Sequence, residues 1–173
     1  MWLKIIGSIF VLIACTYIGF RLSLRCSERP QHIRHFISCI VSLKGYINYI
    51  SMPLPEALIK ATVGTAGPVA VFFHETSKLL ESNIWMNPQQ AIVQVLDNME
   101  AQLAIDKPEK EILTILGANL GAMNREEQNK YITMIQEQLE KLEQEAVRKR
   151  DLNTKMYRYL GVCSGLVVVI LLV

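Results

Sequence analysis

Apolar residues in this chain form two continuous runs near its ends and helix-like stripes between them. Residues 5–20 and residues 160–173 carry no charge. Between them, no stretch alternates apolar and polar residues as a half-buried strand does, and Gly and Pro fall where helical stripes begin or end. The pattern therefore predicts an all-α protein, with a bundle of about five or six helices flanked by an N-terminal and a C-terminal transmembrane helix.

The two uncharged runs predict transmembrane helices at residues 3–20 and 159–173. At about 1.5 Å per residue, the first run spans roughly 24 Å, against a hydrocarbon core of about 30 Å. Tyr17 and Tyr159 can extend these short spans as interfacial anchors, and Lys4 and Arg21 can direct their charged ends outward. The alternative for the second run is a buried C-terminal helix, but its last seven residues offer no polar face.

A lipoprotein signal is the alternative for the first run, because Ala14 precedes Cys15 after a basic residue and an apolar stretch. The apolar stretch continues past Cys15, however, and arginines come soon after it. Basic residues at this place oppose export of the downstream chain. A spanning helix is therefore the favoured interpretation.

Basic residues lie on the inner flank of each run, and such residues tend to stay in the cytoplasm. Residues 21–158 are therefore predicted to form one cytoplasmic domain of an integral membrane protein, with contacts to anionic lipid head groups. The membrane-flanking basic residues are Arg21, Arg25, Arg29, Arg148, Lys149, Arg150, Lys155 and Arg158.

Capping residues and prolines divide the predicted domain into helices. The expected helices cover residues 28–51, 55–62, 68–81, 88 onward, 108–119 and 125 onward, the last running unbroken to the second span. Apolar stripes at three- and four-residue spacing predict the core. They comprise Ile33, Phe36, Ile40, Leu43, Ile47 and Ile50, then Ile92, Val95, Leu96, Met99 and Leu103, and finally Ile132, Ile135, Leu139, Leu142 and Ala146. The first and last long helices are expected to pack on each other.

Charge and cysteine content restrict the possible functions. The net charge is only +2 and the basic residues cluster beside the spans, so the folded part lacks the basic stripe that nucleic-acid binding needs. Four cysteines in a reducing compartment, two of them inside the spans, are expected to remain thiols. Self-association into a homo-oligomer is left open by the sequence.

One cluster of side chains has the residue types of a metal site. His32, His35 and Cys39 share a helical face, and His74 could add one ligand. A structural zinc site needs four ligands, and no second Cys or His pair is present to close it. No phosphate-binding loop, nucleophile elbow or metalloprotease motif is present. We therefore expect no metal, no cofactor, no catalytic residues and no enzyme activity.

A docking surface is predicted at the end of the domain farthest from the membrane. The turn Pro53-Leu54-Pro55 comes after the first long helix, which would extend roughly 33 Å from Pro30 to Ser51. Glu56 and Lys60, one turn apart on the next helix, are the candidate partner-binding charges. Glu109 and Glu111 would join them if their helix packs nearby.

Several short motifs succeed one another in an order typical of a known family. They are Glu28-Arg29-Pro30 with Ile33, Pro53-Leu54 with Ala57, the Leu116-Gly117 and Leu120-Gly121 pairs, and Leu160-Gly161 with Gly165-Leu166. With the two terminal apolar runs, they cover the whole chain. On these residues the chain resembles the stage III sporulation protein AB family.

The resemblance implies a membrane platform of a secretion or channel complex between mother cell and forespore, required for sporulation. The family is similar to inner-membrane platform proteins of type II secretion and type IV pilus systems. It therefore implies partners from the same sporulation operon, including a cytoplasmic secretion-type ATPase, and a domain that faces the mother-cell cytoplasm.

A membrane-tethered signalling or receptor module is the alternative function. It would use the same continuity between a span and a juxtamembrane helix to transmit motion. The partner distinguishes the two, because a platform should bind a secretion-type ATPase and a receptor should bind a kinase or a similar effector.

Overall fold

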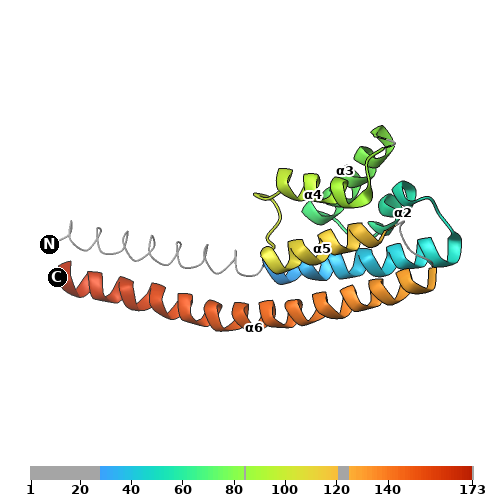
Figure 1. The fold of residues 1–173 in the computed structure, drawn as a ribbon. Coiled ribbons are helices and arrows are strands. Elements are labelled where there is room, and N and C mark those ends of the chain that lie inside the picture. The colour runs from blue at the N-terminus through green and yellow to red at the C-terminus, as the bar shows by residue number, and fades with distance from the viewer. Residues whose placement is uncertain (1–27, 84, 121–124, 173) are drawn as a thin grey trace. The chain divides into compact units, whose positions relative to one another are not determined.

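The structure, a computed structural model, describes residues 28–83, 85–120 and 125–172, without the side chains of residue 125 and residues 153–172. The described part contains six helices and no β-strand, which confirms the predicted fold class (Figure 1). They are the first helix (residues 28–50), α2 (Leu54–Ala61), α3 (Pro68–Ser82), α4 (Pro88–Asn98), α5 (Lys107–Asn119) and α6 (Arg125–Leu172).

The chain divides into two compact units. Arg29–Gln144 form one, called here the helical unit, and Met1–Glu28 with Glu145–Val173 form the other. The predicted span at residues 3–20 lies outside the described residues, and so do the side chains of the predicted span at residues 159–173, where α6 remains helical to Leu172. In the described part of the chain, no helix is long and apolar enough to cross a membrane.

The capping residues predicted from the sequence form hydrogen bonds at the starts of α4 and α5. At the start of α4, Asn87 Oδ1 accepts a hydrogen bond from the Gln90 amide at 2.8 Å, and Gln90 Oε1 accepts from the Asn87 amide at 3.4 Å. At the start of α5, Glu109 Oε2 accepts from the Asp106 amide at 2.8 Å. Each bond satisfies an amide that the helix itself leaves without a partner. The predicted bounds of α2, α3 and α5 and the predicted start of α4 are confirmed to within one residue, whereas α4 ends at Asn98, before Met99 and Leu103 of its predicted stripe.

The first helix packs against the amino-terminal half of α6. Arg34 donates to Glu143 at 2.5 Å, and Lys44 Nζ donates to Thr133 Oγ1 at 2.9 Å. Because the numbering rises along one helix while it falls along the other, the two helices run antiparallel (Figure 1). The predicted packing of the two long helices is confirmed.

The core of the helical unit is built from the predicted apolar stripes and an aromatic cluster. The rings of Phe36, Phe72 and Phe73 contact one another, with Phe72 and Phe73 edge to face at 5.3 Å between centroids. One part of the first stripe was predicted wrongly: Ile47 is half-buried and Ile50 is 59% exposed. Leu142 is also only half-buried. The apolar stripe of the first helix is therefore fully buried from Ile33 to Leu43 and becomes exposed toward the end of the helix.

Helices α4 and α5 cross at close range because Gly117 has no side chain. A Cβ atom at this position would lie 2.8 Å from Gln89 Cα and 3.0 Å from Ile92 Cδ1. Such distances are shorter than non-bonded carbon atoms tolerate. Gly117 therefore sets how closely the start of α4 approaches α5.

Candidate functional site

The predicted docking charges on α2 lie at the end of the helical unit where the first helix turns back. Ser51, just after that helix, has a left-handed conformation with φ 55°, and the Met52 amide donates to Tyr46 O at 3.3 Å. The chain then enters α2, where Ala57 is buried and both Glu56 and Lys60 are exposed. Both charges therefore lie at the surface, and their contact with a partner stays a prediction.

Helix α2 is fixed against α3 by two polar contacts. Ser77 Oγ donates to Pro55 O at 2.8 Å, and Thr62 Oγ1 lies 3.2 Å from His74 Nε2. These contacts make α2 and α3 antiparallel, so the start of α2 lies near the end of α3. Glu56 is therefore mounted on a supported helix and not on a free loop.

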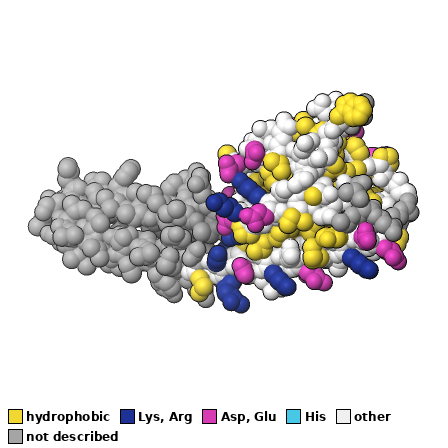
Figure 2. Space-filling view, in the orientation of Figure 1, with side chains coloured by type: hydrophobic (Ala, Val, Ile, Leu, Met, Phe, Trp, Pro, Cys, Tyr) yellow, Lys and Arg dark blue, Asp and Glu magenta, His cyan; other side chains and the backbone are white. Residues whose placement is uncertain are grey.

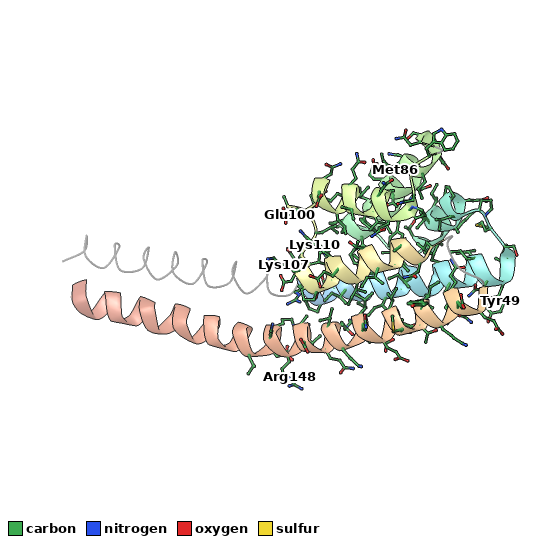
Figure 3. The ribbon with its side chains drawn as sticks, in the orientation of Figure 1. Tyr49, Met86, Glu100, Lys107, Lys110 and Arg148 are labelled. Carbon is green, nitrogen blue, oxygen red and sulfur yellow. The ribbon has the colours of Figure 1, made fainter. Side chains whose placement is uncertain are left out.

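The prediction that Glu109 supplies a docking charge needs correction. Glu109 is only 1% exposed and its Oε1 accepts from Arg29 Nη2 at 2.5 Å. Arg29 lies at the opposite end of the first helix from the turn that leads into Glu56. Lys107 and Lys110 beside Glu109 lie correspondingly far from Tyr49 in Figure 3. Glu111 is exposed, but its helix does not bring it to the α2 surface, so the four predicted charges do not form one site.

Arg29 has a structural role that the sequence did not reveal. Its guanidinium binds Asp106 at 2.6 Å and Glu109 at 2.5 Å, and its side chain is 19% exposed. Arg29 was predicted among the membrane-flanking residues that contact lipid head groups, but both of its Nη atoms bind these carboxylates. A carboxylate that is buried needs a partner of this kind to remain charged.

The other predicted membrane-flanking residues are only partly described. Arg148 and Lys149 are exposed, and Arg150 binds Asp151 at 2.9 Å. Arg21 and Arg25, together with the side chains of Lys155 and Arg158, lie outside the described part of the chain.

The possible metal ligands have other partners. His32 Nδ1 accepts from the Ala104 amide at 2.9 Å, and the buried Cys39 thiol donates to Thr65 Oγ1 at 3.6 Å. Burial raises the pKa of the Cys39 thiol, and the hydrogen bond to Thr65 partly offsets this effect. Among the described residues, no group of three His, Cys, Asp or Glu side chains could hold a metal ion.

Comparison with known proteins places the chain among sporulation proteins. The model of the family described as "Stage III sporulation protein AB" matches residues 4–173. The chain belongs to this family. Within the family, the stage III sporulation protein AB of Bacillus subtilis (strain 168) is 32% identical over 170 residues, which are 98% of this chain and 99% of that protein. A solved structure named "Stage III sporulation protein AB (SpoIIIAB)" has a TM-score of 0.67 at 30% identity and covers 72% of this chain and 98% of its own.

Three of the motifs that carry the resemblance to the stage III sporulation protein AB family have a structural explanation in this chain. Arg29 of the first motif holds the start of α5, Ala57 of the second lies on the buried side of α2, and Gly117 of the third permits the crossing with α4. These residues support the fold. None of them is an exposed site for a partner.

Sequence reasoning missed the most exposed large apolar side chain among the described residues. Trp85, between α3 and α4, is 97% exposed, ahead of Tyr49 at 88% and Val63 at 75%. Trp85 stands two residues before the Asn87 cap, so its place in a connection was readable from the sequence. Its exposure was not, because tryptophan is usually largely buried.

Proposed function

We propose that this chain is the membrane-anchored platform of a sporulation-specific secretion or channel complex between mother cell and forespore, and that it recruits a cytoplasmic secretion-type ATPase of the same operon. The proposed location is an integral membrane protein whose helical unit faces the mother-cell cytoplasm. The proposed role is non-catalytic. Family membership supports the place in sporulation, and two features of the structure support the platform role.

The continuity of α6 is the observation that carries the proposal. This helix includes 48 residues, from Arg125 in the helical unit to Leu172 in the second predicted span. At about 1.5 Å per residue it extends roughly 72 Å without an interruption. An unbroken helix of this kind would mount the helical unit firmly on the membrane, as a platform requires.

The packing of the helical unit also favours a scaffold over an enzyme. Its buried ionisable groups Glu109 and Cys39 already have structural partners, since Glu109 binds Arg29 and Cys39 binds Thr65. A catalytic acid, base or nucleophile needs to reach a substrate. The exposed charges Glu56 and Lys60 remain the proposed contact with the ATPase.

Binding of the ATPase to the full-length chain in lipid nanodiscs tests the recruitment. We expect the wild type to bind and the double charge reversal Glu56→Lys with Lys60→Glu to weaken binding several-fold, with helicity and membrane insertion unchanged. Reversal of Glu111, which is exposed on another helix, is the matched control and should have little effect. If the wild-type chain does not bind the ATPase, the proposed recruitment is wrong.

Cysteine labelling tests the orientation in the membrane. Single cysteines at Arg25 or Lys149, in a chain whose four native cysteines are replaced, should resist a membrane-impermeant reagent applied to intact mother cells. They should react once the cells are opened. Labelling in intact cells would contradict the cytoplasmic placement of the helical unit.

A further inference from the structure

Trp85 is displayed on a turn that is held on both sides by hydrogen bonds. The Asn83 amide donates to Leu79 O at 3.0 Å and ends α3, and the Met86 amide donates to Asn83 O at 3.0 Å and closes the turn. The capping box of Asn87 and Gln90 comes directly after it. Trp85 is thus exposed over 97% of its surface. A tryptophan side chain has only two χ angles, so its immobilisation on binding costs little conformational entropy.

The chain around Trp85 contains acidic and amide groups, and the cation that precedes it on α3, the exposed Lys78, is paired with Glu75 at 2.5 Å. From Leu79 to Asp106 the chain has no Lys or Arg. On the face seen in Figure 2, Lys and Arg gather at the start of α5 and along α6, and the α3–α4 region shows none. Glu100 and Asp106 are neutralised by Lys110 and Arg29.

Two exposed carboxylates remain on these helices: Glu81 at the end of α3, which forms the Trp85 corner together with the Trp85 turn, and Asp97 near the end of α4, roughly 14 Å along that helix from Pro88. Beside Asp97, the outer face of α4 has a shallow hollow. It is lined by Gln89, Gln90, Val93, Gln94, Asp97 and Asn98. The four amide side chains and the one carboxylate that line this hollow favour binding of a polar protein surface that carries positive charge.

Helix α3 connects the Trp85 corner to the start of α2, where Glu56 is exposed. The hydrogen bond from Ser77 to Pro55 O places the start of α2 beside α3. Helix α3 ends five residues later at Ser82, about 7.5 Å along its axis. The start of α2, with Glu56, therefore lies beside the last part of α3, which leads to Glu81 and Trp85.

We propose that Trp85 is the apolar anchor of the docking surface and that its occupant is a basic surface of the secretion-type ATPase, with Arg or Lys side chains against the indole and the carboxylates of Glu81 and Asp97. This inference rests on the proposed function. Tryptophan is the residue most favoured for cation–π contacts and is enriched among residues that dominate binding energy. The absence of cations from Leu79 to Asp106 opposes the alternative occupant, an anionic lipid surface.

The test measures ATPase binding to full-length variants in nanodiscs. Trp85→Ala should weaken binding about tenfold or more, as removal of a central anchor does. Glu81→Lys with Asp97→Lys should weaken it severalfold at low salt, with a smaller effect at high salt. Leu152→Ala removes another exposed large apolar side chain, 65% exposed, from the part of α6 outside the helical unit and should leave binding unchanged. Because Trp85 makes almost no intramolecular contact, its replacement should not alter the melting temperature.

The outcomes separate this inference from the proposed function. If the wild type binds the ATPase and both the Trp85 and the acidic variants bind equally well, the Trp85 anchor is wrong while recruitment stands. If the wild type does not bind, recruitment itself fails. The variant Trp2→Phe leaves Trp85 as the sole tryptophan. In nanodiscs of anionic lipid without ATPase, its fluorescence should be readily quenched by acrylamide, and protection there would identify the membrane as the occupant and overturn the proposal.

Discussion

At the scale of single residues, one ion-pair cluster connects two distant parts of the helical unit. Arg29 of the first helix binds Asp106 in the connection before α5 and Glu109 in its first turn. Glu109 in turn accepts the Asp106 amide at 2.8 Å. The buried carboxylate of Glu109 thus caps the start of α5 and attaches it to the start of the first helix. Its charge is tolerable only because Arg29 faces it.

Replacement of Arg29 by Met should therefore destabilise the protein. It leaves the carboxylate of Glu109 buried without its cation, at a cost of about 3 kcal/mol, the low end of the range for a broken buried pair because Arg29 is partly exposed. We expect the melting temperature of the full-length chain in detergent to fall by about 6–12 °C. Glu111→Gln, an exposed acid on the same helix, should change it little, and equal melting of both variants would contradict the structural role of the cluster.

The Cys39 thiol predicts a specific dependence of stability on alkaline pH. Its pKa is raised by burial above the ordinary value of 9.0, so the folded chain holds this proton to higher pH than the unfolded chain does. Below that value both states are protonated and stability does not depend on this group. As the pH rises above it, the unfolded chain loses the proton first and stability falls, by at most about 1.4 kcal/mol per pH unit.

Unfolding free energies of the wild type and Cys39→Ala between pH 8 and pH 10.5 check this prediction. The other three cysteines are present in both proteins, so their contributions cancel in the difference. The wild type should lose more stability across this range than the variant. Parallel pH profiles would show that the thiol ionises equally well in both states.

At the scale of elements, the effect of a glycine on stability depends on whether its helix is crossed closely by another helix. Gly117 lies where α4 and α5 approach closely, and a Cβ would meet the backbone of Gln89. Gly45, inside the first helix, has nothing within 4 Å of the position of a Cβ. The same substitution should therefore have opposite effects at the two positions.

We expect Gly117→Ala to destabilise the fold and Gly45→Ala to stabilise it. Alanine gains about 1 kcal/mol of helix propensity over glycine at either position. At Gly117 the gain is exceeded by overpacking against backbone, which costs about 1–3 kcal/mol and cannot be relieved by rotating a side chain. Chemical denaturation of the two variants measures both effects, and a stabilised Gly117→Ala would show that α4 moves aside easily.

At the scale of the whole molecule, α6 is the covalent and helical connection between the two compact units. It enters the helical unit at Arg125 and continues past Gln144 into the unit that contains the second predicted span. If the proposed platform role is correct, the stiffness of this connection matters in addition to the fold of each unit. A local break within α6 should therefore leave the fold of the helical unit intact and impair sporulation.

Lys149→Pro introduces such a break. Proline removes a backbone hydrogen bond and costs about 3 kcal/mol in a helix interior, which should uncouple the two units without disturbing the core of the helical unit. We expect unchanged binding of the ATPase to the helical unit but a strongly reduced yield of spores. Lys149→Ala removes the same exposed side chain without breaking the helix and should sporulate normally. Normal spore yield with the proline variant would contradict a mechanical role for α6.

The sequence by itself determined the helical fold and nearly every helix boundary. Asn87 before Pro88 and Asp106 before Glu109 are signals read within a few residues, because the backbone groups that they satisfy are local. Most of the buried stripes were also readable, since their period comes from the geometry of the helix itself.

Only the tertiary structure decided which charged and aromatic residues are available to a partner. Glu109 is buried because Arg29, eighty residues away in the sequence, lies against it. Trp85 is 97% exposed in the connection between α3 and α4 because almost nothing covers it. Exposure depends on which remote elements approach a side chain, and no local pattern of residues encodes that approach.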